Sequence, residues 1–159
     1  MLDVGCGYGY TSSLVAQNSK FVVGIDLREE AIIACGDKYK KDNLSFENKD
    51  LFSISYKDNF NLIILSNVLE HIDDRIQFLD QCSKVANKLL IIVPAFDRDW
   101  KIPYKKKLNV EWRKNLDHRL EYTQKILCDE LNESNYKVDE IFSRWGNYCC
   151  KATVREKND

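Results

Sequence analysis

The stretch Leu2-Asp3-Val4-Gly5-Cys6-Gly7-Tyr8-Gly9-Tyr10 decides the fold, because a short apolar segment ends there in alternating glycines. Residues 2–4 predict a buried strand, and we expect a helix from about Thr11 whose unpaired N–H groups point back toward the glycines. A glycine has no Cβ, so the chain can turn sharply and lie directly against a ligand. A strand, a glycine turn and a helix in this order predict a cofactor site in an α/β fold.

A second acidic residue, Asp26, follows the apolar run of residues 21–25, which predicts the next strand. It lies 26 − 9 = 17 residues after Gly9, close to the roughly 20 residues after which α/β nucleotide-binding folds place an acid on the ribose. A carboxylate has two acceptor oxygens and can bind both ribose hydroxyls. The alternative is that Asp26 caps the helix predicted over residues 27–39.

The spacing D-x-G-x-G-x-G, from Asp3 to Gly9, resembles motif I of class I S-adenosylmethionine-dependent methyltransferases, in particular the type 11/12-like domain. A dinucleotide fingerprint would instead place its third glycine at Tyr10. The resemblance implies S-adenosyl-L-methionine as the cofactor. It also implies cofactor contacts from the turn and from the end of the second strand, namely from Asp3, Gly5, Cys6, Gly7, Tyr8, Gly9, Asp26 and Leu27.

Two further segments extend the resemblance. Asp50 and Leu51 follow the strand predicted over 44–49 and match the position where an acid accepts a hydrogen bond from the adenine amino group, although Asp50 could also be a solvated helix cap. Residues 66–72, Ser-Asn-Val-Leu-Glu-His-Ile, closely resemble a segment of methyltransferases that act on small molecules and lipids. The resemblance places Asn67 beside the methionine part of the cofactor.

The rest of the chain alternates between strand-like and helix-like segments. We expect strands at 62–65, 89–93, 137–143 and 148–155, and helices at 74–86 and 123–134. Gly146 and Asn147 supply a tight turn between the last two strands, which predicts a hairpin. The expected fold is a Rossmann-like α/β fold with a seven-stranded, mostly parallel sheet, an antiparallel C-terminal hairpin strand, and helices on both faces.

The length of 159 residues fits one domain, and the resemblance covers nearly all of it. Family members usually carry a helix upstream of the first strand that covers the cofactor, and we expect this helix to be missing here. Either the chain is a fragment or it is a smaller version with a more open site. Residues 94–122 predict an irregular insert that binds the acceptor.

Three residues are candidates for catalysis. His71 could act as a general base near the transferred methyl, because an imidazole can accept a proton near neutral pH, or it could orient the loop or face solvent. Related enzymes carry a histidine before an aromatic residue and a helix-starting threonine, as His118, Tyr122 and Thr123 do here. His118 and Tyr122 are therefore candidates for contact with the acceptor, and the alternative is that His118 is buried and holds the insert in place.

Composition narrows the possible partners. A net charge of −1 argues against nucleic acid held by charge alone, and there is no apolar run that could span a membrane. The six cysteines include no C-x-x-C pair, so we expect no zinc or other metal site, and we expect reduced thiols in the cytoplasm. The lysines at 105–107 predict a solvated loop or a contact with an anionic acceptor.

These observations predict a methyltransferase that acts on a small molecule, a lipid or a glycan precursor. Two alternative functions from other classes of protein also fit the fold. A non-catalytic relative would keep the fold to bind the cofactor or a partner. A nicotinamide-dependent oxidoreductase would use the same architecture, but it would need separate explanations for Asp50 and Asn67.

Overall fold

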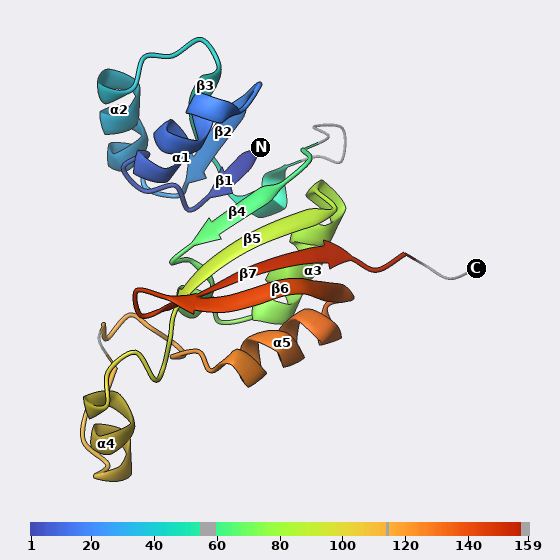
Figure 1. The fold of residues 1–159 in the computed structure, drawn as a ribbon. Helices are drawn as coiled ribbons and strands as arrows, with labels where there is room; N and C mark the ends of the chain where they lie inside the picture. Colours follow the sequence, from blue (N-terminus) through green and yellow to red (C-terminus); the bar gives the residue numbers. More distant parts are fainter. Residues whose placement is uncertain (55–59, 114, 157–159) are drawn as a thin grey trace.

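A computed structural model describes residues 1–54, 60–113 and 115–156, which form a seven-stranded sheet with helices around it (Figure 1). The strands are β1 (Leu2–Val4), β2 (Val22–Asp26), β3 (Leu44–Asn48), β4 (Ile63–Ser66), β5 (Lys88–Pro94), β6 (Tyr136–Arg144) and β7 (Asn147–Val154). The α-helices are α1 (Tyr10–Val15), α2 (Glu29–Lys38), α3 (Arg75–Val85), α4 (Lys101–Lys107) and α5 (Gln124–Glu133). Short 3-10 helices include η2 (Leu51–Ser53) and η4 (Leu69–His71).

The sheet has the strand order β3-β2-β1-β4-β5-β7-β6. Strands β1 to β5 are parallel, and β7 is antiparallel to both of its neighbours, β5 and β6. From the central β1 the chain builds outward through β2 and β3, and then returns to build the other half from β4. The order therefore reverses between β1 and β4, and ligands of open α/β sheets bind at the carboxyl ends of the strands at such a point.

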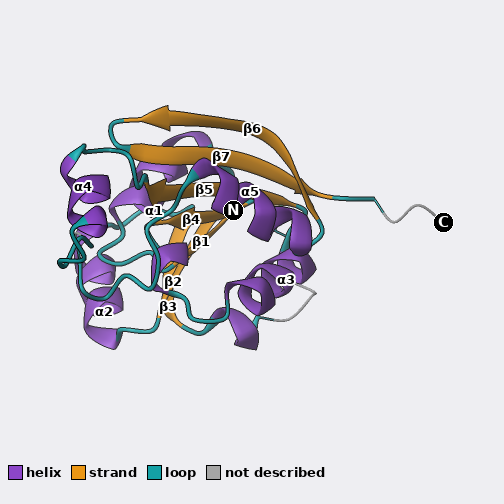
Figure 2. Cartoon of the chain, turned by 90° about the horizontal axis from the view of Figure 1, so that it is seen from below, coloured by secondary structure: helices purple, strands orange, loops and turns teal. Residues whose placement is uncertain are grey.

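The helices cover both faces of the sheet, because right-handed crossovers that proceed in opposite directions from the centre lie on opposite faces. Helices α3 and α5 lie together on one face (Figure 2). Their apolar side chains, among them Leu79, Cys82, Leu127 and Leu131, pack with the central strands into the main core. A smaller cluster of Ala16, Val22 and Leu44 lies beyond the end of α1, and Val15 and Phe46 pack against it.

The final two strands form the expected hairpin, but its turn is one residue earlier than the sequence predicts. Trp145 and Gly146 make the turn with φ angles of 49° and 74°, and Asn147 pairs with Arg144 as the first residue of β7. Positive φ at both central residues is typical of two-residue hairpin turns, because their twist matches that of the strands. The tip brings Trp145, which is 86% exposed, to the carboxyl-end side of β5.

The insert expected over residues 94–122 begins at the end of β5, and its last residue lies beside its first residues. The Phe96 N–H donates to the Tyr122 carbonyl at 2.7 Å, and Ala95 forms a parallel bridge with Tyr122. Between these residues the chain contains α4, which the sequence analysis did not predict and which projects away from the sheet (Figure 1). Pro103 is the third residue of α4, where a helix has no intrahelical partner for its N–H groups, so a proline is tolerated there.

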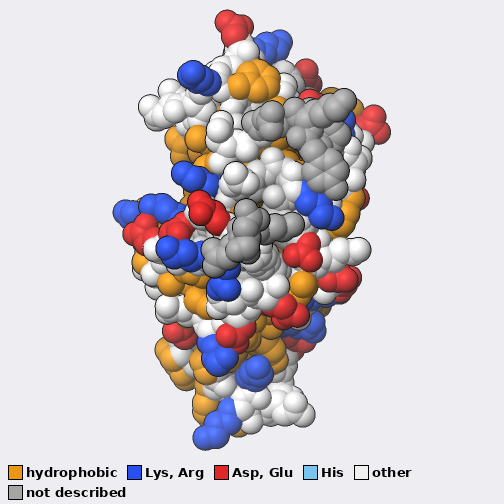
Figure 3. Space-filling view, turned by 90° about the vertical axis from the view of Figure 1, so that its right-hand side faces the viewer, with side chains coloured by type: hydrophobic (Ala, Val, Ile, Leu, Met, Phe, Trp, Pro, Cys, Tyr) orange, Lys and Arg blue, Asp and Glu red, His pale blue; other side chains and the backbone are white. Residues whose placement is uncertain are grey.

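None of the helices in the described part of the chain is long and apolar enough to cross a membrane. Each of the six cysteines is a free thiol. On the face shown in Figure 3, acidic and basic side chains are interspersed.

Candidate active site

The glycine turn after β1 packs closely against Val68, which follows β4, and against Phe46 of β3. Gly5 and Gly9 have φ angles of 66° and 72°, in the left-handed region that favours glycine. A Cβ on Gly5 would lie 2.7 Å from Cγ2 of Val68, and a Cβ on Gly9 would lie 2.7 Å from Cζ of Phe46. Both positions therefore require glycine for conformation and for space.

Asp26 links this turn to the end of β2. Its Oδ2 accepts the Gly7 N–H at 2.8 Å, and its Oδ1 accepts from the backbone N–H of Arg28 at 3.0 Å and from Arg28 Nε at 3.2 Å. Burial works against the charge, but the hydrogen bonds from Arg28 and Gly7 outweigh it and lower the pKa of Asp26. The carboxylate is thus charged at neutral pH, and it also orders the chain before α2.

A cavity of about 300 Å³ lies beside Asp26, at the carboxyl ends of β1 and β2. Its walls are mainly apolar, and they include Leu27, Leu51, Val68, Ile72 and Phe78. Gly5, Asp26 and Asp50 also line it. The cavity therefore combines an apolar interior with carboxylates from the ends of two adjacent strands.

Asp50 has two roles in the structure. Its Oδ1 accepts the Phe52 N–H at 3.0 Å and so caps η2, which was the alternative role expected from the sequence. Its exposed side chain also lines the cavity next to Leu51. Asp50, two residues after the end of β3, thus starts a short helix and presents a carboxylate to the cavity.

Three of the expected cofactor residues make contacts within the chain. Asp3 is buried, and its Oδ2 accepts from Ser12 Oγ at 2.5 Å, which ties β1 to α1. Burial raises the pKa of Asp3 to about 6. Cys6 is buried with its N–H donating to the Ile25 carbonyl at 2.9 Å, and the exposed Tyr8 ring lies 5.7 Å from the Arg28 guanidinium carbon.

A second cavity, of about 630 Å³, is polar and lies beyond the ends of β4 and β5. Asn67 lines it and has a φ of 55°, a conformation that asparagine tolerates better than most side chains. Its neighbour Val68 lines the first cavity. The two cavities are therefore separated by consecutive residues of one segment.

The two histidines of the chain meet at this second cavity. The centres of the His71 and His118 rings are 4.8 Å apart, and the rings are nearly perpendicular at 86°. Both residues line the cavity together with Glu70. The contact depends on the insert, whose Arg119 N–H donates to the Glu70 carbonyl at 2.8 Å.

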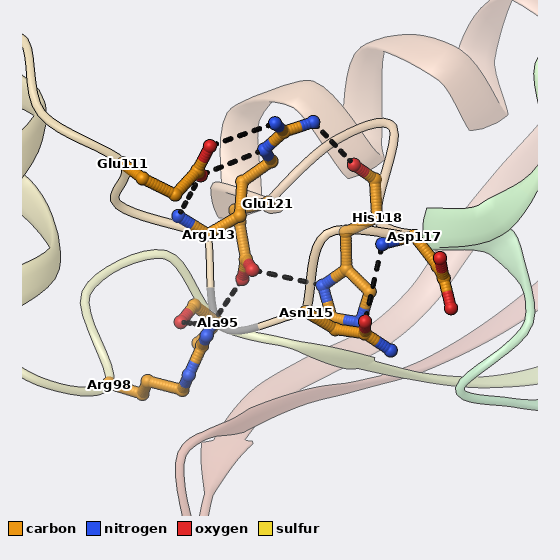
Figure 4. Close-up of polar contacts among 8 residues, drawn as sticks. All are labelled: Ala95, Arg98, Glu111, Arg113, Asn115, Asp117, His118 and Glu121. Atoms are coloured by element: carbon orange, nitrogen blue, oxygen red, sulfur yellow. Dashed lines mark hydrogen bonds and ion pairs between the residues drawn. The ribbon is translucent and has the colours of Figure 1, made fainter.

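Glu121 orients His118 (Figure 4). Its Oε1 lies 2.9 Å from His118 Nδ1, and its Oε2 forms an ion pair with Arg98 Nη1, which also donates to the Ala95 carbonyl at 2.8 Å. His118 and Arg98 approach the carboxylate from different sides (Figure 4). Since a carboxylate accepts, Nδ1 carries the proton of this hydrogen bond, and in the neutral form of the ring Nε2 keeps its lone pair.

Glu70 differs from every other acid at the site. It is 1% exposed, and neither oxygen of its carboxylate has a hydrogen-bond partner within the part of the chain that the structure describes. Burial raises the pKa of Glu70 to about 7, and the nearby charge of Glu121 acts in the same direction. A buried carboxyl group without a hydrogen-bond partner destabilises the folded state, so we expect Glu70 to bind a partner such as a ligand or an ion.

Tyr122 does not join this group, although the sequence analysis made it a candidate for contact with the acceptor. Its side chain is fully buried in the main core, and its hydroxyl donates to Glu130 Oε2 at 2.6 Å. Burial and this acidic partner raise the pKa of Tyr122. Tyr122 therefore holds the end of the insert against α5.

Three residues of the site were missed by sequence reasoning, namely Glu70, Arg98 and Glu121. A weak signal existed for Glu121, which follows His118 at a spacing of three residues. Glu70 precedes His71 directly, but an acid at the start of a helical turn is usually exposed. Its burial depends on the return of the insert, which no local pattern reveals.

Comparison with known proteins identifies the family. Residues 2–89 match the sequence model of a family described as a methyltransferase domain. The chain belongs to this family. Membership confirms the class expected from the glycine turn, and it supports S-adenosylmethionine as the cofactor of this methyltransferase domain.

Two relatives illustrate the range of similar proteins. The methyltransferase domain is 31% identical over 144 residues to a probable cobalt-precorrin-6B C(15)-methyltransferase (decarboxylating) of Methanobrevibacter smithii, covering 87% of this chain and 70% of the relative. It is 27% identical over 104 residues to a ubiquinone biosynthesis O-methyltransferase of Rhodopseudomonas palustris, covering 64% of this chain. The match covers 41% of that relative's length.

Solved structures confirm the fold of the methyltransferase domain. An S-adenosylmethionine-dependent methyltransferase of Methanosarcina mazei superposes with a TM-score of 0.78 at 18% identity, covering 96% of this chain and 91% of the other. Magnesium protoporphyrin IX methyltransferase of Synechocystis, with bound S-adenosylhomocysteine, gives a TM-score of 0.76 at 16% identity, covering 97% and 73%. The expected Rossmann-like fold is therefore correct.

Proposed function

We propose that this protein transfers the methyl group of S-adenosylmethionine to a small-molecule acceptor that binds in the second cavity. One observation carries the proposal. A mainly apolar cavity with two carboxylates and a polar cavity with two histidines are adjacent at the switch point of the sheet, and the consecutive residues Asn67 and Val68 line one each. A methyl donor and its acceptor need two such neighbouring sites.

The first cavity fits the cofactor. The charged carboxylate of Asp26 would accept hydrogen bonds from the ribose hydroxyls, with Arg28 moving aside from Oδ1, and Asp50 would accept one from the adenine amino group. Leu51 and Phe78 offer apolar surface for the adenine ring. The absence of a Cβ at Gly5 lets the turn approach the ligand closely.

When bound, S-adenosylmethionine supplies an electrophilic methyl group on a sulfonium. The contribution of the chain is mainly to hold the acceptor in line with it, and such positioning alone contributes roughly 7–11 kcal/mol. His71 and His118 face the cavity where the acceptor would lie, and Glu121 fixes the orientation of the His118 ring. Either imidazole is placed to receive a proton from the acceptor.

A third cavity favours an acceptor of a particular charge. It measures about 580 Å³, shares Arg98 and Trp145 with the second cavity, and carries Lys101, Lys105 and Arg113 against one acid, Asp99. This excess of positive charge favours an acceptor with an anionic group, such as a lipid or glycan precursor. The six free thiols agree with a cytoplasmic location, which we propose for the reaction.

Calorimetric titration of the purified chain with S-adenosylmethionine, S-adenosylhomocysteine and NAD tests the proposal. We expect saturable binding of the first two ligands and none of NAD. Binding of NAD alone would overturn the proposal in favour of an oxidoreductase. A folded chain that binds S-adenosylmethionine but methylates nothing in a screen of hydroxyl-containing acceptors would instead favour a non-catalytic role.

A further inference from the structure

We propose that Glu70, His71 and His118 bind a divalent transition-metal ion on the wall of the second cavity. The three residues come from two segments, since Glu70 and His71 lie in η4 and His118 lies in the insert. One ligand atom from each side chain lies within 4.8 Å of the others. Ligands of one ion at about 2.1 Å are at most about 4.2 Å apart, so small side-chain rotations complete the site.

The buried carboxylate of Glu70 is the observation that points to a cation. Both of its oxygens are without a hydrogen-bond partner in the described residues, and the side chain lines the polar cavity. Buried carboxylates in proteins are paired, hydrogen-bonded or bound to a metal. A cation between Glu70 and the two histidines supplies the missing partner.

Arg98 does not supply the missing partner of the Glu70 carboxylate. Arg98 also lines the second cavity, yet its Nη1 is held by Glu121 and the Ala95 carbonyl, and its Nη2 has no partner in the described part of the chain. Glu70 and Arg98 thus each keep an unpaired polar group at the same cavity without meeting. The Glu121 charge offsets that of Arg98, which limits its repulsion of a metal ion.

Glu121 also provides the outer contact that metal-binding histidines usually have. A histidine ligand almost always donates its second ring N–H to a carboxylate, a carbonyl or water, and this fixes the ring and its tautomer. His118 Nδ1 makes this contact with Glu121 Oε1 at 2.9 Å, so Nε2 is the nitrogen available to the ion (Figure 4). The ring is therefore oriented as a ligand before an ion binds.

The donor set selects the class of ion. Two imidazoles and one carboxylate suit Mn²⁺, Fe²⁺, Co²⁺ or Zn²⁺ better than Mg²⁺ or Ca²⁺, which prefer oxygen donors. Three protein ligands leave coordination positions open toward the cavity, as in catalytic metal sites. One carboxylate against a divalent ion leaves a net positive charge at the site, which an anionic oxygen of the acceptor would balance.

The role of this ion rests on the proposed methyl transfer. A hydroxyl group of the acceptor that binds to the ion would have a lowered pKa and release its proton to water, because the two histidines then bind the ion and are not available as bases. The bond between the sulfonium sulfur and the methyl carbon then breaks as the bond from the acceptor oxygen to that carbon forms, and a neutral thioether leaves. The acceptor class that follows is a hydroxyl compound rather than an amine.

Titration with Co²⁺ tests the site, because the visible absorption of bound Co²⁺ reports its ligands. We expect the chelator-treated full chain to bind one Co²⁺ with a visible absorption band. Glu70→Gln and His118→Asn should each weaken Co²⁺ binding more than 100-fold, and Glu121→Gln should weaken it about 10–100-fold, as for other outer contacts. The matched control Glu140→Gln, an exposed acid of β6 that pairs with Lys151, should bind like the parent chain.

The temperature of thermal unfolding distinguishes a variant that has lost metal binding from one that no longer folds. Without metal, Glu70→Gln should unfold at a higher temperature than the parent, because an uncharged amide costs less to bury, but it should lose the further rise that Co²⁺ causes. If Glu70→Gln does not fold, His71→Asn at the half-buried His71 replaces it in the Co²⁺ titration and should bind Co²⁺ more weakly than the parent chain. A folded parent chain that binds no Co²⁺ or Mn²⁺, or variants that bind like the parent, would overturn the metal site.

Binding of S-adenosylmethionine, measured on the same samples, separates this inference from the proposed function. A chain that binds S-adenosylmethionine but no metal refutes the metal site alone. A chain that binds Co²⁺ through Glu70 and His118 but no S-adenosylmethionine refutes the proposed function and leaves the metal site standing.

Discussion

Asp26 Oδ2 accepts the backbone N–H of Gly7 at 2.8 Å, across 19 residues of sequence, and so joins the glycine turn after β1 to the end of β2. The same carboxylate faces the apolar cavity. Asp26 therefore acts both on the shape of the turn and on any ligand that the turn encloses.

Replacement of Asp26 should separate cofactor binding from folding. Asp26→Asn keeps the size of the side chain but loses its charge, so we expect about 10–100-fold weaker binding of S-adenosylmethionine, since a hydrogen bond to a charged group contributes about 1.5–3 kcal/mol. Calorimetry measures the affinity and circular dichroism checks the fold. Asp73→Asn is the control, because Asp73 is 81% exposed and pairs with Arg119. Equal affinities in both variants would refute the ribose assignment.

The sequence predicted the positions of Asp26 and Asp50 in the fold, because both residues follow strands closely. Asp26 ends β2 and Asp50 follows β3, and parallel strands bring their carboxyl ends to one edge of the sheet. Hydrophobic runs therefore placed these residues without knowledge of the contacts. Asp3 was placed on the correct strand, but its partner Ser12 could not be read from the spacing.

The polar cavity could be predicted only in part, because it depends on contacts between distant segments. His71 and His118 were both named as candidates, but their meeting depends on the hydrogen bond from the Arg119 N–H to the Glu70 carbonyl. The burial of Glu70 follows from the same return of the insert. Residues 55–59, between η2 and β4, and Lys114 lie outside the described part of the chain.

Substitutions in the glycine turn should differ with the space around each glycine. Gly5→Ala places a Cβ 2.7 Å from Val68, whereas the nearest atom to a Cβ on Gly7 is a guanidinium nitrogen of Arg28 at 3.5 Å. Both positions have positive φ, so strain of about 1 kcal/mol is common to both. We expect Gly5→Ala to lower the free energy of unfolding by about 1–3 kcal/mol more than Gly7→Ala, because of overpacking.

Urea titrations of both variants measure this difference, and the added change Val68→Ala provides a second test. Removing the two methyl groups of Val68 frees the space that the new Cβ needs. Gly5→Ala should therefore cost less in a Val68→Ala background than in the parent chain. A cost that is the same in both backgrounds would show that backbone strain alone limits this position.

Asp3 should make stability depend on pH. Burial raises its pKa from the usual 3.8 to about 6, so the folded state binds the proton more tightly than the unfolded state does. The stability from this group is fully present below pH 3.8 and is lost as pH rises through about 6. The difference between the two pKa values corresponds to roughly 3 kcal/mol.

Asp3→Asn removes this titration and leaves all other groups in place. The free energy of unfolding of the parent chain, minus that of Asp3→Asn, should fall between pH 4 and pH 7, with most of the fall between the pKa values of about 3.8 and about 6. Denaturant unfolding of both proteins across this range, without cofactor, measures the difference. A difference that is constant with pH, or that rises, would contradict the assigned burial of the carboxyl.

The hydroxyl of Tyr122 donates to Glu130 Oε2 at 2.6 Å, while Arg75 pairs with Oε1 of the same carboxylate at 2.6 Å. Tyr122→Phe should lower the free energy of unfolding by about 1.5–3 kcal/mol, because a hydrogen bond to a charged acceptor is lost. A double-mutant cycle with Glu130→Gln should show coupling of about 0.5–3 kcal/mol between the two residues. Binding of S-adenosylmethionine and of Co²⁺ should stay unchanged in Tyr122→Phe, because the hydroxyl faces α5 and lies outside both cavities. A loss of Co²⁺ binding without a loss of stability would instead indicate that the Tyr122 hydroxyl acts at the second cavity, where the acceptor is proposed to bind.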